Sequence, residues 1–405
     1  MHPPAPPPSE SVSDNDGLSL PLKKIAALCS TFHFRSHADN FVMRCLEGYW
    51  VGQDFHDPPC EVASLYVDQI HQADVSERVS MAYDIPRFSS ITDAITLGTG
   101  ELAVDAVLIV FEHGDYPENE KLQKLYPRYE VMAEIMEVFR KSGRSVPVYL
   151  DKHLSYDWTK AREMYGWSQE LGFPMMAGSS LPVTFRRPEL EAPTGRKIDE
   201  MLVVGGGWYG ESWLLHLMEL AQTFAEQRAG GETGIKSVQL VSGIGVWRGA
   251  LERRWDRSLL DTALARRLVP GLDGQPEDAG RRCIACLIEY RDGLRTTLMC
   301  LGGGFNFDYL IAMRMGDDNE VLSTAFERPA ESADNMSPLV HSIMRMVHTG
   351  KPQAPIERTL LATGALAYLL ESGYRGQVRL DTPDLDVVYE APPNPYFARH
   401  ERPSA

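Results

Sequence analysis

Short apolar runs alternate with amphipathic stretches over the first 150 residues of the chain. The apolar runs, which predict buried strands, cover residues 23–31, 61–68, 104–110 and 146–150. Helical patterns lie between them: one starts near Ser36, one ends near Tyr83, and two more cover 90–97 and 118–141. Because strands that alternate with helices form parallel sheets with right-handed crossovers, we expect residues 22–154 to fold as a Rossmann-like, doubly wound α/β domain.

After residue 154 the spacing changes. A helix is expected at 156–171, strand-like runs at 236–247, 283–290 and 296–301, and two further helices at 338–348 and 357–372. With fewer helices between strands, residues 155–395 are expected to form an α+β domain with an open, mostly antiparallel sheet. We expect residues 1–21 to be a disordered, proline-rich extension, 268–280 a surface loop and 396–405 a tail.

The composition fits a two-domain globular protein of 405 residues, of which 43% are hydrophobic. The net charge of −16 disfavours nucleic acid and anionic membranes as partners. No apolar run approaches the roughly 20 residues of a spanning helix, and the amino terminus lacks a signal-peptide pattern. The lone pair Cys283 and Cys286 has no second pair to complete a zinc site, so both are interpreted as core residues. We therefore expect a cytoplasmic protein with a small-molecule substrate.

Three ionisable residues, Asp151, Lys152 and His153, follow the apolar run 146–150. The carboxyl end of such a strand is where α/β proteins place their reacting groups. A turn with solvated charges is the alternative. Farther along, His216 and Glu219 are three residues apart and so share one helix face. An imidazole beside a carboxylate is suited to moving a hydroxyl proton, although a lone helical histidine can also be an ordinary core residue.

The order of these parts resembles the Gfo/Idh/MocA family of glucose–fructose oxidoreductases and inositol dehydrogenases. Residues 151–153 stand where that family has a Glu-Lys-Pro motif, and 216–219 where it has a His-x-x-Asp pair. The resemblance implies an NAD- or NADP-dependent oxidoreductase, a homo-oligomer, with a sugar-like substrate. It implies that Lys152, His216 and Glu219 are catalytic and that Asp68, at the end of the run 61–68, binds the adenosine ribose.

The chain departs from the family in the first strand-to-helix loop. A dinucleotide fold has Gly-x-Gly-x-x-Gly there, because missing side chains let backbone amides approach the pyrophosphate. Residues 30–39 contain no glycine, although Arg35 and the amides of the next helix could still hold a phosphate. The run 205–210 does spell that motif, but we interpret it as the turn before the catalytic helix. The expected cofactor-binding residues are Thr31, Arg35, His37, Asp68, Glu112, His113 and Asp151.

Imidazoles and carboxylates are unusually dense at the predicted strand ends. They include Glu112, His113 and Asp115 after the run 104–110, together with His33, His37, Asp39, Asp151 and His153. Divalent metals take such ligands, but no pair has a diagnostic short spacing, so a polar sugar pocket explains them equally well and no metal ligand is assigned. The expected substrate-binding residues are His153, Asp115, Tyr116, Ser179 and Ser180.

Two functions remain open. The first is hydride transfer between NAD(P) and a sugar, polyol or related hydroxy or keto compound, with Lys152 and His216 handling the proton. The second is a protein of the same fold that has lost normal dinucleotide binding and acts as a non-redox, possibly metal-assisted, sugar isomerase or lyase, or as a binding protein. Either function predicts that the loop 31–39 lies beside Asp68, and that Lys152 and His216 meet across one cleft.

Overall fold

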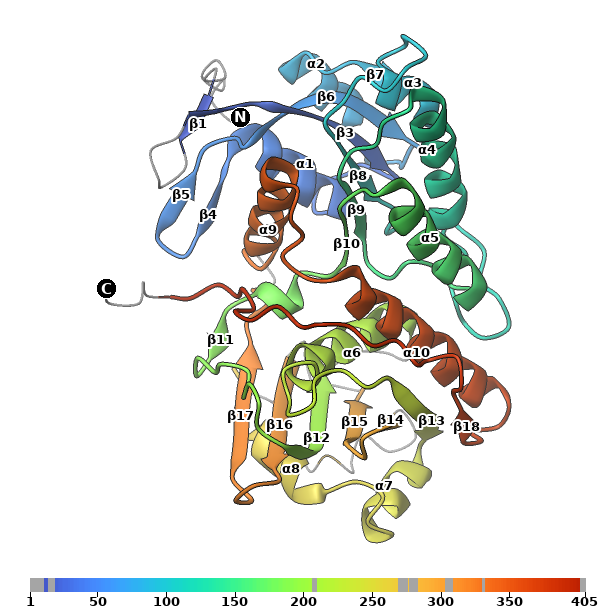
Figure 1. Cartoon of the computed structure of the whole chain (residues 1–405), viewed down its shortest axis with the longest axis vertical. Helices are drawn as coiled ribbons and strands as arrows, with labels where there is room; N and C mark the ends of the chain where they lie inside the picture. The colour runs from blue at the N-terminus through green and yellow to red at the C-terminus, as the bar shows by residue number, and fades with distance from the viewer. Residues whose placement is uncertain are drawn as a thin grey trace.

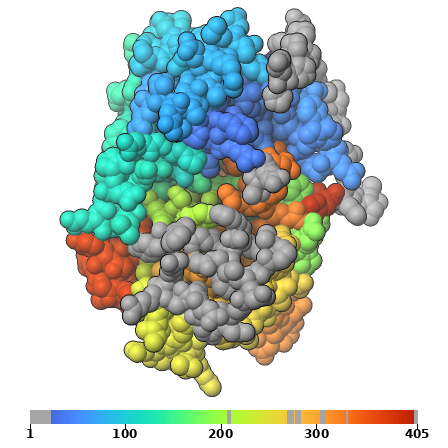
Figure 2. Space-filling model, turned by 180° about the vertical axis from the view of Figure 1, so that it is seen from behind, coloured from blue at the N-terminus to red at the C-terminus, as the bar shows by residue number. Residues whose placement is uncertain are grey.

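The computed structural model describes residues 11–13, 19–205, 210–268, 276, 283–302, 309–329 and 332–400. The chain forms two lobes, each built around its own β-sheet (Figure 1). Seen from behind, the first lobe and the pair α7 (Ile244–Leu251) and α8 (Arg257–Leu264) lie at opposite ends of the molecule (Figure 2).

The first sheet has six parallel strands in the order β10-β9-β8-β3-β6-β7. Its strands are β3 (Lys23–Cys29), β6 (Cys60–Val67), β7 (Arg87–Phe88), β8 (Ala106–Val110), β9 (Val148–Asp151) and β10 (Met175–Gly178). All five residues of β8 are buried, which fits a central strand covered on both faces. The doubly wound parallel sheet is confirmed.

Helices cover both faces of this sheet. On one face lie α1 (His37–Glu47), α2 (Ser76–Tyr83) and α9 (Met336–Thr349). On the other lie α3 (Ile91–Thr96), α4 (Arg128–Ser142) and α5 (Trp158–Leu171). The sheet and its layers thus include β10 and α5, which follow residue 154, and α9 from near the carboxyl end of the chain.

The second sheet has eight mostly antiparallel strands in the order β11-β17-β16-β12-β15-β14-β13-β18, with β12 and β15 parallel. Its strands are β11 (Arg186–Arg187), β12 (Ile198–Gly205), β13 (Ile235–Ser242), β14 (Ile284–Tyr290), β15 (Arg295–Cys300), β16 (Tyr309–Met315), β17 (Val321–Phe326) and β18 (Leu380–Asp381). The helices α6 (Glu211–Ala225) and α10 (Ile356–Tyr374) bury one face. Residues of α7 and α8 pack on the other. The expected α+β lobe is confirmed.

Two expected elements have different bounds. The helix expected at 118–141 begins only at Arg128, because Pro127 disfavours a helical conformation for the residue before it. The run 236–247 is a strand only to Ser242. Gly243 then takes a left-handed conformation with φ of +59°, and α7 starts at the next residue.

The chain ends are more ordered than expected where the structure describes them. The short strands β1 (Ser11–Ser13) and β2 (Ser19–Pro21) pair with each other inside the expected extension. Phe397 and Ala398 of the expected tail are buried, and the Ala398 N–H donates to the carbonyl of Val183 in the short 3₁₀ helix Leu181–Val183. Most of the loop 268–280 lies outside the described residues.

A small hairpin of β4 (Tyr49–Val51) and β5 (Asp54–His56) follows α1. The six cysteines are unpaired and buried, as expected for core residues. In the part of the chain that the structure describes, no helix has the length and apolarity needed to cross a membrane.

Candidate active site

Three loop residues at the carboxyl edge of the first sheet have positive φ angles. Arg35 (+63°), His113 (+73°) and Lys152 (+75°) come after β3, β8 and β9, respectively. A left-handed backbone costs a residue with a Cβ about 1 to 3 kcal/mol, and such residues cluster at functional sites. All three line one pocket, so three residues with this backbone conformation come together at a single cavity.

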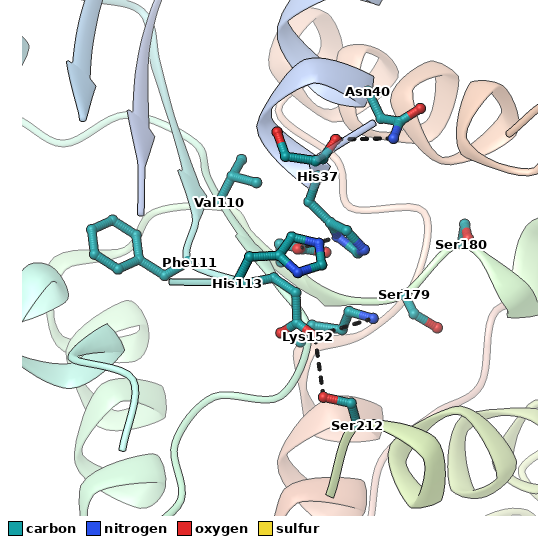
Figure 3. A network of polar contacts seen from close by, with 12 residues as sticks. His37, Asn40, Val110, Phe111, His113, Lys152, Ser179, Ser180 and Ser212 are labelled. Atoms are coloured by element: carbon teal, nitrogen blue, oxygen red, sulfur yellow. Dashed lines mark hydrogen bonds and ion pairs between the residues drawn. The ribbon is translucent and has the colours of Figure 1, made fainter. Parts of the chain in front are cut away.

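The pocket lies between the lobes, and both lobes contribute to it. The first lobe supplies residues of α1, of the end of β9 and of the loops after β3, β8, β9 and β10. α6 supplies His216, and the chain after β17 supplies the remainder. The lining residues are Arg35, His37, Asn40, His113, Asp151, Lys152, Ser179, Ser180, Leu181, His216, Arg328, Pro329, Ala333, Asn335 and Met336. Figure 3 shows the rings of His37 and His113 lying close together beside Lys152.

Lys152 meets His216 at the wall of this pocket. Its side chain is almost fully buried, with 4% exposed, and Nζ lies 3.2 Å from His216 Nε2. Nζ is also 3.8 Å from Glu112 Oε1. Residues 64 positions apart in the sequence therefore approach across one cleft, which confirms the expected geometry.

A hydrogen-bonded chain leads from His216 into the interior. His216 Nδ1 lies 3.0 Å from Ser179 Oγ, and the Ser179 hydroxyl donates to Glu219 Oε2 at 2.5 Å. The Ser179 N–H donates to the other carboxylate oxygen at 2.9 Å. Gly178 leaves room for this carboxylate, because a Cβ there would stand 2.3 Å from Glu219 Oε1.

Burial and nearby charges shift both ends of that chain. Burial, Lys152 and Arg328 together hold the pKa of His216 well below its usual value, so the imidazole is neutral. Burial raises the pKa of Glu219 to about 7, although the two hydrogen bonds from Ser179 oppose the rise. A carboxyl group with a pKa near 7 is suited to proton transfer near neutral pH.

Glu112 is the carboxylate that pairs with Lys152. Arg128 Nη2 donates to Glu112 Oε2 at 2.9 Å, and the Ser212 hydroxyl donates to Oε1 at 3.1 Å. Lys152 and Arg128 hold the pKa of the Glu112 carboxyl well below its usual range, although burial opposes them. Glu112 therefore remains charged and keeps the Lys152 ammonium in place.

His153 does not line the pocket, although it was expected to bind substrate. It is 2% exposed and lies 3.3 Å from Glu211 at the start of α6. Gln123 donates to the same Glu211 oxygen, and Arg128 contacts His153. These residues join the lobes, because α6 belongs to the second sheet. Ser179 and Ser180 do line the pocket.

The loop after β3 lies beside Asp68, as expected. The N–H groups of Asp68 and Gln69 donate to the carbonyls of Cys29 and Ser30. Asp68 itself accepts from the hydroxyls of Tyr66 and Tyr116, at 2.9 and 2.7 Å. Tyr116 and the neighbouring Asp115 are thus placed next to Asp68, outside the pocket that holds Lys152.

Side chains of the protein accept from two amides of the loop before α1 and from one amide of its first turn. Ser36 Oγ accepts from the N–H groups of His33 and Asp39, and the Asp39 carboxylate accepts from the Arg35 N–H at 2.9 Å. The start of α1 therefore carries its own anion. Thr31 is buried and does not line the pocket.

Histidines gather at the same edge, and His37 Nδ1 lies 2.6 Å from Asp151 Oδ2. The rings of His33 and His71 are 4.3 Å apart, and those of His37 and His113 are 5.2 Å apart. Among the described residues, no three histidines, cysteines or carboxylates lie close enough together to hold a metal ion.

The pocket residues that follow β17 (328, 329, 333, 335 and 336) were missed by sequence reasoning. The basic residue Arg328 and the amide residue Asn335 lie about 180 positions after Lys152. Asn335 Nδ2 donates to Ser180 Oγ at 2.7 Å. No motif marks these residues, so only the packing of the lobes brings them to the pocket.

Comparison with known proteins identifies solved structures with a similar fold but no family from the sequence. No family model and no curated protein matches the sequence. GenD2 from gentamicin A biosynthesis, solved in complex with NAD, matches with a TM-score of 0.56 and 12% identity, over 93% of this chain and 99% of its own. For scyllo-inositol dehydrogenase from Lactobacillus casei the TM-score is 0.54 and the identity 10%, over 89% and 98% of the two chains.

A third structure, myo-inositol 2-dehydrogenase from Lactobacillus plantarum, matches with a TM-score of 0.54 and 12% identity, over 89% of this chain and 99% of its own. At these identities the likeness concerns the fold. Over most of its length, the chain is structurally similar to dehydrogenases of the Gfo/Idh/MocA type, as the resemblance in sequence predicted.

Proposed function

We propose that this chain is an oxidoreductase that uses NAD or NADP and acts on a hydroxyl group of a sugar, polyol or related compound. The observation that carries the proposal is the contact of Lys152 Nζ with His216 Nε2, 3.2 Å apart, at a pocket between the lobes. The similar structures named as inositol dehydrogenases, and the one solved with NAD, support the choice of reaction and cofactor.

The polarity of the hydrogen-bonded chain assigns the proton positions. The Ser179 hydroxyl donates to Glu219, so its oxygen accepts from His216 Nδ1–H. The Nε2 lone pair of His216 then faces Lys152 and the pocket. A neutral imidazole in this tautomer is ready to accept the proton of a substrate hydroxyl.

The same chain provides an exit for that proton. When Nε2 accepts the substrate proton, the Nδ1 proton passes to Ser179 and the Ser179 proton passes to Glu219. A carboxyl group whose pKa is about 7 can take it at neutral pH. The Lys152 ammonium stabilises the negative charge that develops on the substrate oxygen. A bound nicotinamide supplies the acceptor for the hydride.

The described residues fit the ribose and nicotinamide parts of a dinucleotide better than its pyrophosphate. Asp68 ends β6 at the usual position of a ribose-binding acid, and Lys152 stands at the end of β9. A pyrophosphate at the start of α1 would compete with the protein's own side chains, because Ser36 accepts from the Asp39 N–H and the Asp39 carboxylate accepts from the Arg35 N–H in the loop before the helix. Arg35, which lines the pocket, is the nearby group that could bind a phosphate instead.

That occupied helix start favours a second candidate function, in which the same proton chain serves a non-redox isomerase or lyase. The Asp39→Ala variant separates the two. It removes the competing carboxylate, so an oxidoreductase should bind NADH or NADPH several-fold more tightly, as expected when a charged hydrogen bond is released. Fluorescence titration of the reduced cofactors measures this.

The direct test is turnover. The purified protein is mixed with NAD or NADP and a panel of inositols, aldoses and sugar acids, and absorbance at the reduced nicotinamide band is followed. We expect one dinucleotide to bind and at least one substrate to be oxidised. If neither the natural chain nor the Asp39→Ala variant binds either dinucleotide, the oxidoreductase assignment is wrong and the non-redox candidate replaces it.

A further inference from the structure

The charge of the pocket is opposite to that of the protein. The whole chain has a net charge of −16, yet three permanently or normally cationic side chains line this pocket: Arg35, Lys152 and Arg328. Asp151 is the carboxylate among the lining residues, and it is held by His37 at 2.6 Å. The charged Glu112 lies 3.8 Å from Lys152 and offsets its charge, so the cationic excess of the pocket comes from Arg35 and Arg328. A cavity lined by one sign of charge concentrates ligands of the opposite sign.

The three cationic side chains of the pocket differ in how deeply they are buried. Lys152 is buried at the wall of the cavity, next to His216, whereas Arg35 and Arg328 are exposed residues of opposite lobes. Arg35 precedes α1, where a cofactor phosphate is expected. Arg328 follows β17 of the second lobe, on the side of His216, and its charge helps to lower the pKa of that imidazole. Arg328 is therefore the second cation, besides Lys152, whose charge acts on His216, and it lines the same pocket.

Neighbouring polar groups can donate to a ligand as well. Asn335 donates to Ser180 Oγ, so the serine hydroxyl can turn its own proton toward a ligand. Ser180, Asn335 and Arg328 line the same pocket. A guanidinium presents paired N–H groups that match a carboxylate or a phosphate. The side-chain oxygen of Asn335 can accept from a substrate hydroxyl, so this side of the pocket suits a compound that carries both an anionic group and hydroxyls.

We propose that the substrate of this site is a hydroxylated compound carrying an anionic group, a carboxylate or a phosphate ester, and that Arg328 binds that group. The inference rests on the proposed function, since it names the substrate class of the same site. The substrate hydroxyl lies at Lys152 and His216, and the anionic group points toward the second lobe. Binding of the anion also offsets the two cations that hold the pKa of His216 low, and so raises the basicity of the imidazole when substrate is present.

Isothermal titration calorimetry on the full chain, without cofactor, tests this. The probes are inorganic phosphate, D-gluconate and D-glucose 6-phosphate, with neutral D-glucose for comparison. At least one anion should bind roughly 10-fold or more tightly than glucose, and its affinity should fall as salt is raised. Gluconate against glucose 6-phosphate distinguishes a carboxylate from a phosphate ester.

The Arg328→Gln variant should weaken binding of that anion by roughly 10-fold, the usual loss for a charged hydrogen bond. The matched control is Arg375→Gln, because Arg375 pairs with Glu371 on α10, away from the pocket, and it should leave the affinity unchanged. The inference is overturned if none of the three anions binds, if glucose binds as tightly, or if Arg328→Gln and the control behave alike.

These outcomes are separable from failure of the proposed function, because the titration needs no turnover and no dinucleotide. Anion binding that depends on Arg328, in a protein that never reduces NAD or NADP, would retain the substrate class and reject the redox chemistry. Turnover of a neutral polyol with no effect of Arg328→Gln would retain the redox chemistry and reject the substrate class.

Discussion

Replacing Glu219 by glutamine tests the buried proton chain directly. Glutamine has nearly the same shape, and its amide can still accept from the Ser179 N–H, as Glu219 Oε1 does at 2.9 Å. The amide N–H₂ would face Ser179 Oγ, so the serine proton would turn toward His216 Nδ1. The chain then has no group that can take up a proton, and we expect turnover to fall by roughly 10²- to 10⁴-fold.

The raised pKa of Glu219 also predicts how much its ionisation destabilises the native protein. Burial raises the pKa of Glu219 from 4.5 to about 7, and each pKa unit corresponds to about 1.4 kcal/mol. A carboxyl with a raised folded-state pKa contributes stability that is fully present below pH 4.5 and is lost as the pH rises through 7. Ionisation of Glu219 therefore costs the native protein up to about 3 kcal/mol above that range.

Urea unfolding at two pH values measures this cost. Near pH 5 the natural chain and the Glu219→Gln variant should have similar free energies of unfolding. The control variant is Glu163→Gln. Glu163 is an exposed carboxylate on α5 that accepts from the Tyr129 hydroxyl. Near pH 8 the Glu219→Gln variant should gain up to about 3 kcal/mol relative to the natural chain. A constant difference between the two pH values would refute the raised pKa and with it the role of Glu219 as proton acceptor.

The other predictions concern the residues that shape the site. Gly178→Ala should lower the free energy of unfolding by roughly 2 to 4 kcal/mol and reduce turnover, because its Cβ would clash with Glu219 at 2.3 Å and φ is +127°. Gly143→Ala, where φ is +62° and no atom lies within 4 Å, should cost only about 1 kcal/mol in urea unfolding and leave turnover unchanged. Lys152→Met should keep the circular dichroism spectrum and lose roughly 10²- to 10⁴-fold in turnover, and a variant with normal activity would remove Lys152 from the mechanism.

The fold could be predicted because hydrophobic periodicity reports local structure. The runs that became β3, β6, β8 and β9 are short, continuous and apolar, as expected for strands covered on both faces. The helix expected at 118–141 failed at its start, where Pro127 ends a segment held by the side chain of Asn119, which accepts from the N–H groups of Lys121 and Gln123. Such local side-chain bonds compete with a helix and leave little trace in periodicity.

The site was predictable only where a residue ends a strand or shares a helix face with another. Lys152 and His216 were found in that way, and their contact follows from the order of the elements. His153 lies away from the pocket, because residue 152 takes a left-handed backbone and the chain then turns into the contact between the lobes. Arg328 could not be found, since its position depends on how the two lobes pack and on no pattern around it.

The two features that separate this chain from an ordinary dinucleotide fold have one physical consequence. Ser36 accepts from the Asp39 N–H in the first turn of α1, Asp39 accepts from the Arg35 N–H in the loop before it, and the Tyr116 and Tyr66 hydroxyls donate to Asp68. A cofactor must displace these intramolecular hydrogen bonds before it forms its own. Each hydrogen bond to the cofactor therefore contributes less binding free energy than a bond to a free amide would. Binding energy for a dinucleotide would thus come mainly from charge, through Arg35, and its affinity should depend on ionic strength more steeply than in a fold whose glycine loop supplies free amides.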